Sequence, residues 1–399
     1  MFNKCRKCNY INFGKTNRYI FLILIEALLS CASDIIEKKS KFFTQKNLVT
    51  FIYSICVSLG YSLSFILFII YKIRNKRKNN NANQLIIRQT NINKISWKKK
   101  MLWVLLLSII SFIDILLFSF ILVKFDNYLN FWPFYIIFLS IFSFLILKNK
   151  LYKHHFISII TITILILLNN ILSNNLTIDS IKENYIFYLL GIVNMIFYSL
   201  ELVLYKYCML IKYIKSYEIL FFGGLIILAL SIISLIIAIK IGYIDNFRNY
   251  YENIDKIEVI IFISLSLINF IYGILLLIII DIFSPFYMLL ADKVENLIYF
   301  FYTLNENDLS FTLFYIVFLI IYIFMVLVFI ELIELNFLGL SKMTKRNIEL
   351  RARFESLESN EYDINDTSDS ILEGYIIHDE NEVELNKDEI TDGKTVSNE

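Results

Sequence analysis

Apolar residues gather into about ten blocks of roughly twenty residues each, and this pattern constrains the fold more than any other feature of the chain. A hydrocarbon core roughly 30 Å thick is crossed by about twenty residues of α-helix. Hydrophobic residues make up 57% of the 399 positions, which is more apolar surface than one water-soluble core of this length buries. The pattern predicts an all-α integral membrane protein with about ten transmembrane helices.

The predicted spans follow the apolar blocks. In chain order they are 18–36, 48–71, 101–123, 131–147, 155–172, 185–204, 217–239, 257–280, 285–302 and 311–335. A basic, Asn-rich linker over 72–100 separates the second span from the third, and its polarity predicts a loop. Pro133 and Pro285 both fall in the first turn of a span, where a missing N–H group costs least.

Lys and Arg are distributed unevenly between the two sets of loops. The N-terminal arm, the basic linker, the loops after the fourth and sixth spans and the segment after the tenth span hold about 26 of them, and the opposite loops hold about nine. The positive-inside rule therefore places both termini in the cytosol, which requires an even number of spans. Ten spans divide into five and five with opposite orientation, so the pattern predicts two inverted five-helix repeats.

On this plan the chain has four parts. A basic cytosolic arm (1–17) precedes the first half with spans one to five (18–172), which contains the basic linker. The second half with spans six to ten (173–340) is followed by an acidic cytosolic tail (341–399), whose composition predicts disorder in isolation.

Two short patterns suggest modification or regulation. Asn175 begins an Asn-Leu-Thr sequon on the predicted lumenal or outer side and is a candidate glycosylation site. In the tail, Ser368 and Ser370 flank Asp369, which would suit an acid-directed kinase. A tail that only solvates the protein and a tail that makes a trafficking or kinase contact both remain open.

Metal-binding patterns are weak in this sequence. Cys5 and Cys8 have CxxC spacing, but no second pair follows them. His154 and His155 are adjacent rather than four residues apart and lie in a basic loop, so we expect them to be solvated at the membrane interface. The sequence therefore predicts no metal site and no cofactor.

Ionisable side chains inside the predicted spans are the candidates for function, because each costs about 2.5–3.5 kcal/mol or more to insert and should face a cavity or a partner. Glu26, Asp114 and Glu201 are candidate solute- or ion-binding residues, with a structural ion pair to Lys206 or a helix end as the alternative for the last two. Lys206 lies just past the inner end of span six, where its side chain could reach a solute, and it is also a candidate.

Two polar pairs add to this candidate site. Asn194 and Glu201 are seven residues apart and share one helix face, and Asn269 and Tyr272 share a face of span eight. These side chains could line a cavity, or the two asparagines could hydrogen-bond neighbouring helices to each other.

The remaining charged residues of the spans have simpler expected roles. Asp292, Lys293 and Glu295 should pair with one another along one helix. Glu331 and Glu334 should be solvated near the inner end of span ten.

Several segments resemble the drug/metabolite transporter superfamily (EamA-type), and its solute carrier 35-like branch in particular. Tyr205-Lys206-Tyr207-Cys208 and the following 213–224 resemble the family segment EKY…YELLFYEG, although Tyr205 and Gly223 stand where the family has acidic residues. Similar segments are 111–114, 140–151, Phe283-Ser284-Pro285 and 336–340, so the resemblance covers roughly 101–353.

The resemblance implies ten helices in two inverted halves around a central cavity. It also implies transport of a small solute: members of the family carry nucleotide sugars, phosphorylated sugars, vitamins, amino acids or cationic drugs. Many work in endomembranes, so we expect the Golgi, the ER or a vacuole or endosome rather than the plasma membrane.

The charges inside the spans narrow this expectation. A phosphorylated solute needs Lys or Arg in the cavity, but Arg18 at the edge of the first span is the only Arg within a span, and carboxylates outnumber Lys206 and Lys293. We therefore expect a secondary transporter of a neutral or cationic organic solute that is proton-coupled through a carboxylate. A nucleotide-sugar or sugar-phosphate exchanger is the alternative within the family, and a non-transporting scaffold or receptor-like membrane protein is the alternative outside it.

The sequence contains no motif of a catalytic site, so we expect no enzyme activity. The expected partners are a small-molecule solute and the lipid bilayer, and no nucleic acid.

Overall fold

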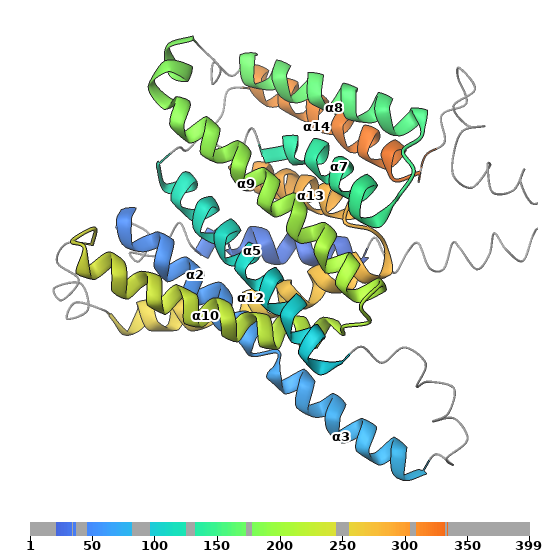
Figure 1. The fold of residues 1–399 in the computed structure, drawn as a ribbon. Helices are drawn as coiled ribbons and strands as arrows, with labels where there is room; N and C mark the ends of the chain where they lie inside the picture. The colour runs from blue at the N-terminus through green and yellow to red at the C-terminus, as the bar shows by residue number, and fades with distance from the viewer. Residues whose placement is uncertain are drawn as a thin grey trace, which may run out of the picture. The chain divides into compact units, whose positions relative to one another are not determined.

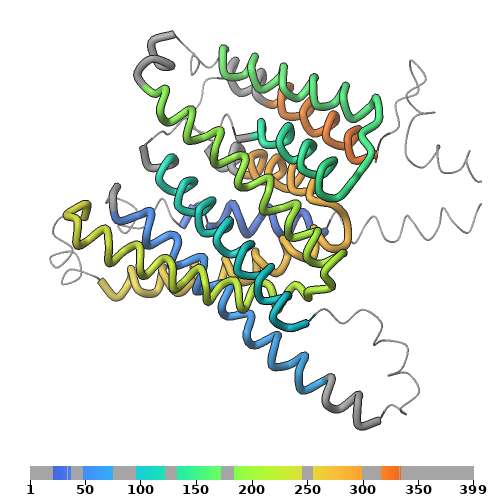
Figure 2. Tube along the Cα trace, in the orientation of Figure 1, coloured from blue at the N-terminus to red at the C-terminus, as the bar shows by residue number. Residues whose placement is uncertain are grey.

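The computed structural model describes residues 21–33, 35–36, 46–81, 96–124, 132–172, 178–244, 255–303, 309–331 and 333. Asn175, the Cys5–Cys8 pair, Glu334 and the acidic tail lie outside these residues. Over the described ranges all regular structure is helical, and they contain no strand (Figure 2).

The first described helix is Phe21–Ser33. The elements labelled in Figure 1 are α2 (Lys46–Ser62), α3 (Phe65–Asn81), α5 (Trp97–Lys124), α7 (Tyr135–Leu147), α8 (Lys153–Leu172), α9 (Ile178–Leu210), α10 (Ser216–Lys240), α12 (Lys256–Ile282), α13 (Tyr287–Thr303) and α14 (Leu309–Phe329), with the short 3₁₀ turn η2 (Trp132–Phe134) before α7. Each of the predicted spans overlaps a described helix.

Within the described residues, six helices are long and apolar enough to cross a membrane: Leu48–Arg74, Trp97–Ile121, Lys153–Ile171, Asn184–Leu210, Ser216–Lys240 and Lys256–Ile282. Three shorter apolar helices, Phe21–Ser33, Tyr135–Leu147 and Ile316–Phe329, accompany them. The charged helix α13 belongs to neither group, since it contains Asp292, Lys293 and Glu295. These helices are compatible with a multi-pass membrane protein.

The distribution of side chains fits the bilayer as the solvent. Large apolar side chains point outward along several helices, for example Leu102, Leu145 and Ile260, which are 65%, 62% and 63% exposed. Serines, asparagines and carboxylates are buried instead, among them Glu26, Asp114 and Asn194. In a lipid environment such polar groups must find partners inside the protein.

Several predicted boundaries are wrong; the sixth span, predicted over 185–204, is part of the longer helix Ile178–Leu210. The basic linker is not a loop throughout, because α3 continues through its first part to Asn81 and α5 already begins at Trp97. A helix that is already nucleated extends at little cost, and Lys and Arg have good helix propensity. The tenth span ends earlier than predicted, at Phe329, because Glu331 takes a left-handed backbone conformation with φ 59°.

Helix α2 packs against both α10 and α12. Two glycines permit this close packing. A Cβ atom on Gly224 of α10 would lie 2.6 Å from the backbone nitrogen of Ser62, and one on Gly60 of α2 would lie 2.6 Å from the backbone oxygen of Ser266. Small residues at such contacts are the usual means by which membrane helices approach each other closely.

We expect Gly224→Ala to lower the thermal unfolding temperature of the detergent-purified protein, by an overpacking penalty of about 1–3 kcal/mol. The added methyl group would meet backbone atoms of α2, which cannot move independently. Gly223→Ala is the matched control, since its Cβ would meet only the Ser108 hydroxyl at 3.2 Å. Equal unfolding temperatures for the two variants would contradict this packing.

Helices α5 and α9 form the other long contact, and α9 also packs against α7 (Figure 1). Asp114 of α5 meets Asn194 of α9, whereas the earlier residue Ser111 meets the later residue Glu201. The two helices are therefore antiparallel, and their shared face carries most of the buried polar residues described next.

Candidate functional site

The first part of the site is a hydrogen-bonded pair between α5 and α9. The side-chain amide of Asn194 donates to the Asp114 carboxylate at 2.8 Å and to the Asp114 main-chain oxygen at 3.0 Å. Both side chains are buried, Asp114 at 7% exposure and Asn194 at 0%. A charge-assisted bond of this kind fixes the carboxylate in one position at the centre of the helix pair.

Two turns along α9 from Asn194, on the same face, the Glu201 carboxylate is held by hydroxyl groups. Ser111 donates to its Oε1 at 2.6 Å, and the Tyr205 hydroxyl also hydrogen-bonds to Glu201 and lies 3.3 Å from that of Ser111. Glu201 and Asp114 lie close enough to interact electrostatically. The α5–α9 contact thus presents two carboxylates that are supported by neutral partners.

A second group of carboxylates comes from other helices. Glu26, on the helix Phe21–Ser33, is 1% exposed and hydrogen-bonds to Tyr272 of α12. Its second oxygen, Oε2, is buried without a hydrogen-bond partner among the described residues. Asp292 of α13 accepts a hydrogen bond from the Tyr135 hydroxyl at 2.7 Å and lies within electrostatic range of Glu26.

Tyr198 of α9 connects the two groups. Its ring packs edge-on against that of Tyr135, with ring centroids 5.1 Å apart. Its hydroxyl lies within electrostatic range of all four carboxylates, Asp292, Asp114, Glu26 and Glu201. We call Glu26, Asp114, Glu201 and Asp292 the carboxylate cluster.

One basic side chain lies near this cluster in the described part of the chain. Lys293 lies within electrostatic range of both Asp292 and Glu295, and its ammonium lies 4.6 Å from the centre of the Tyr322 ring. Asp292 has a partner beyond its own helix, because Tyr135 of α7 donates to it. Acidic groups therefore outnumber basic groups around the site.

Two predicted site residues have local roles in this structure. The Lys206 ammonium donates to the main-chain oxygen of Asp281 at 2.5 Å, in the last turn of α12, where a cation suits the helix dipole. The amide of Asn269 donates to the Leu265 oxygen of its own helix at 2.9 Å and packs on Gly60. Tyr272, by contrast, joins the cluster through Glu26.

A small recess adjoins Glu201 between α5, α9 and α10. Its lining includes Ser111, Tyr205, Tyr61, Gly223 and Gly224. Its volume of about 10 Å³ corresponds to about one water molecule, so this recess is too small for an organic solute.

The sequence interpretation missed Tyr135 and Tyr198. A signal for Tyr198 was present, because it lies four residues after Asn194 and three before Glu201 on the same helix face. No local pattern indicates Tyr135, since its contact with Asp292 joins residues 157 positions apart.

No protein-family model matches this chain, and no curated protein matches it.

Proposed function

We propose that this chain is a secondary transporter of a small neutral or cationic organic solute, coupled to protons through buried carboxylates. The observation that carries the proposal is the carboxylate cluster. Ionisable groups at membrane depth are costly and typically mark solute paths or proton relays. Buried carboxyl groups without balancing cations take up protons instead of staying charged, and Lys293 is the one described cation near the cluster.

The chemistry of the cluster favours a cation or a neutral solute over a phosphorylated one. Phosphate groups are bound in proteins by Arg and Lys, but Lys206, which was the second candidate base, donates to the end of α12 instead. Tyrosine rings and carboxylates together suit an organic cation, because both the face of a ring and a carboxylate attract positive charge.

The proposal includes ten spans in two inverted halves, and six of the helix contacts support this plan, whereas α12–α13 and α13–α14 have no comparable counterparts among the described helices. If each helix is exchanged for the one five spans later, the contact α2–α12 becomes α10–α5, and α2–α5 becomes α10–α12. All four contacts are present. The contacts α2–α10 and α8–α14 each exchange with themselves.

The contacts of two carboxylates are also related by this exchange of helices. Glu26 of the first span contacts Tyr272 of the eighth, and Glu201 of the sixth contacts Ser111 of the third. Such a relation is expected where two inverted repeats meet at a solute site near the bilayer midplane. Together with the segment resemblance, it favours a transporter of the drug/metabolite type in an endomembrane, with both termini cytosolic.

Counterflow in liposomes tests the proposal. The purified protein would be reconstituted and offered a mixed panel of organic cations, amino acids, sugar phosphates and nucleotide sugars at two pH values. We expect exchange of a cationic or neutral solute whose rate changes with pH. Exchange of nucleotide sugars would overturn the charge argument and would make Lys206 and Lys293 the residues to test. No exchange of any solute would favour a scaffold or receptor-like protein.

A further inference from the structure

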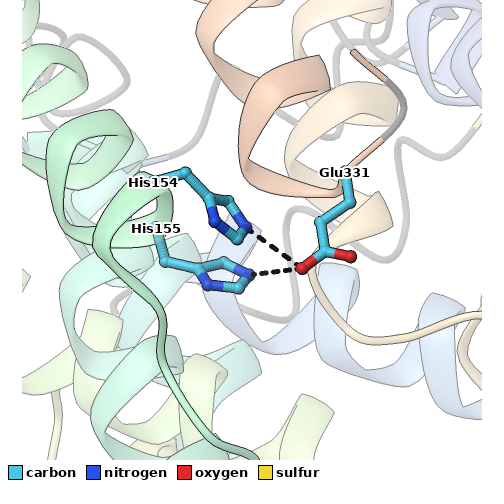
Figure 3. Close-up of side chains that lie close together, drawn as sticks. All are labelled: His154, His155 and Glu331. Carbon is cyan, nitrogen blue, oxygen red and sulfur yellow. Dashed lines mark ion pairs between the residues drawn. The ribbon is translucent and has the colours of Figure 1, made fainter. Parts of the chain in front are cut away.

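Two histidines and a glutamate meet where α8 begins and α14 ends (Figure 3). His154 and His155 lie in the first turn of α8, and Glu331 follows the end of α14. The His154 Nε2 atom lies 3.1 Å from Glu331 Oε1, and the His155 Nε2 atom lies 4.0 Å from the same oxygen. One ligand atom from each of the three residues lies within 4.8 Å of the others.

This arrangement corrects the expectation from sequence for His154, which is not solvated, whereas His155 and Glu331 are partly exposed. His154 is 3% exposed, and the Glu331 side chain is 21% exposed. The left-handed backbone at Glu331 ends the helix, and its carboxylate faces the two imidazoles in the close-up (Figure 3). Adjacent histidines can therefore face one partner because they lie in the first turn of a helix that packs against α14.

The buried imidazole of His154 carries the inference. Neither Nδ1 nor Nε2 of His154 has a hydrogen-bond partner among the described residues, although both atoms are buried. A buried polar group without a partner costs about 1–3 kcal/mol. The Glu331 oxygen is near enough to Nε2 but does not satisfy it as a hydrogen bond. An ion at this place would give His154 Nε2 a partner and would be bound by the carboxylate as well.

We propose that His154, His155 and Glu331 bind a divalent transition metal of the Zn²⁺ class and that this metal joins α8 to α14. Two imidazoles and a carboxylate are ligands that Zn²⁺ and its neighbours Co²⁺ and Ni²⁺ accept. Three protein ligands leave a fourth position for water. This proposal does not depend on the transport proposal, because it concerns a different group of residues and its test measures metal binding.

The distances fit such a site after a small movement. With metal–ligand bonds of about 2.0–2.2 Å, tetrahedral ligand atoms are about 3.3–3.6 Å apart. The separation of 3.1 Å between His154 and Glu331 is already close to this value. To reach this spacing, the ring of His155 must move by about 1 Å toward the other two ligand atoms.

Binding also requires a proton to move within His155. Its Nδ1 accepts a hydrogen bond from the backbone N–H of Tyr152 at 3.0 Å, so the neutral ring carries its proton on Nε2. When the ring shifts toward the metal, it leaves Tyr152, the proton resides on Nδ1, and the Nε2 lone pair becomes the ligand. The aromatic rings of Tyr152 and Phe329 pack against His155 and limit the ring to short displacements.

Cobalt binding tests this site directly. CoCl₂ would be titrated into the full-length protein in detergent, in a Cys5→Ser, Cys8→Ser background that removes the CxxC pair as a competing site. We expect one equivalent of Co²⁺ with the visible absorption of a tetrahedral complex. His154→Gln, His155→Gln and Glu331→Gln should each weaken binding by more than about tenfold, since even loss of a group behind a metal ligand costs 10–100-fold.

The third histidine of the chain, His378, supplies the matched control, and His378→Gln should bind Co²⁺ as the parent does. Thermal unfolding with and without Zn²⁺ separates loss of metal binding from poor folding. Zn²⁺ should raise the unfolding temperature of the parent and not that of Glu331→Gln, because a ligand stabilises the state that binds it. No Co²⁺ absorption by the parent, or unchanged binding in both histidine variants, would overturn the proposal.

Discussion

Glu201→Gln is expected to abolish most solute exchange in liposomes while leaving the fold intact. The amide has nearly the shape of the carboxylate and its oxygen can still accept from Ser111 and Tyr205, but it can neither take up a proton nor pair with a cation. A hydrogen bond to a charged group is worth about 1.5–3 kcal/mol, which corresponds to a loss of about 10- to 150-fold in exchange rate. The pH dependence of the residual exchange should also flatten.

Glu258→Gln is the control for this experiment. Glu258 is as buried as Glu201, at 7% exposure, but it lies in the first turn of α12 and not in the carboxylate cluster. It should keep the exchange rate and its pH dependence. Full exchange by Glu201→Gln would remove Glu201 from the mechanism, and equal losses in both variants would point to a general effect of removing a buried acid.

The double variant Glu26→Leu, Tyr272→Phe is expected to be more stable than the parent and yet inactive. The Glu26 side chain is 1% exposed, and its Oε2 atom has no hydrogen-bond partner among the described residues. Leaving a buried polar atom unpaired costs about 1–3 kcal/mol. Replacing both members of the Glu26–Tyr272 pair by apolar groups removes this cost and leaves no hydroxyl behind. The unfolding temperature in detergent should rise, and counterflow should be lost.

Glu201→Leu provides the comparison. The Glu201 carboxylate is supported by Ser111 and Tyr205, so its removal takes away the acceptor that both hydroxyl groups share and should lower the unfolding temperature. Opposite signs for the two positions are expected if Glu26 is maintained for function at the expense of stability. A Glu26→Leu, Tyr272→Phe protein that unfolds at lower temperature and still exchanges solute would show that the pair is structural.

Helix positions could be predicted from the sequence because long apolar runs of the right length have few alternatives in a bilayer. The predicted boundaries of α8, α10 and α12 differ from the observed ones by only one or two residues. The errors came where polarity was the only guide. The end of α3 is basic and still helical, and the end of α14 is set by the backbone at Glu331 rather than by composition.

The candidate site could be predicted in part. The spacing of Asn194 and Glu201 placed them on one face, and the structure brings that face against Ser111 and Asp114. The partners of Glu26 and Asp292 could not be predicted, because Tyr272 and Tyr135 come from distant helices whose packing no local pattern records. The same is true of His154, whose burial depends on its contact with Glu331.

The glycine contacts of α2 have a mechanical consequence. Because Gly60 and Gly224 hold backbones of α2, α12 and α10 at distances that leave no space for a methyl group, these three helices cannot slide past one another without a collision of main chains. They should move together as one rigid unit. The α5–α9 contact is joined by side-chain hydrogen bonds, which can exchange partners without a steric barrier. If the protein opens toward either side of the membrane, the change should begin at the α5–α9 contact, where Asp114 and Glu201 lie.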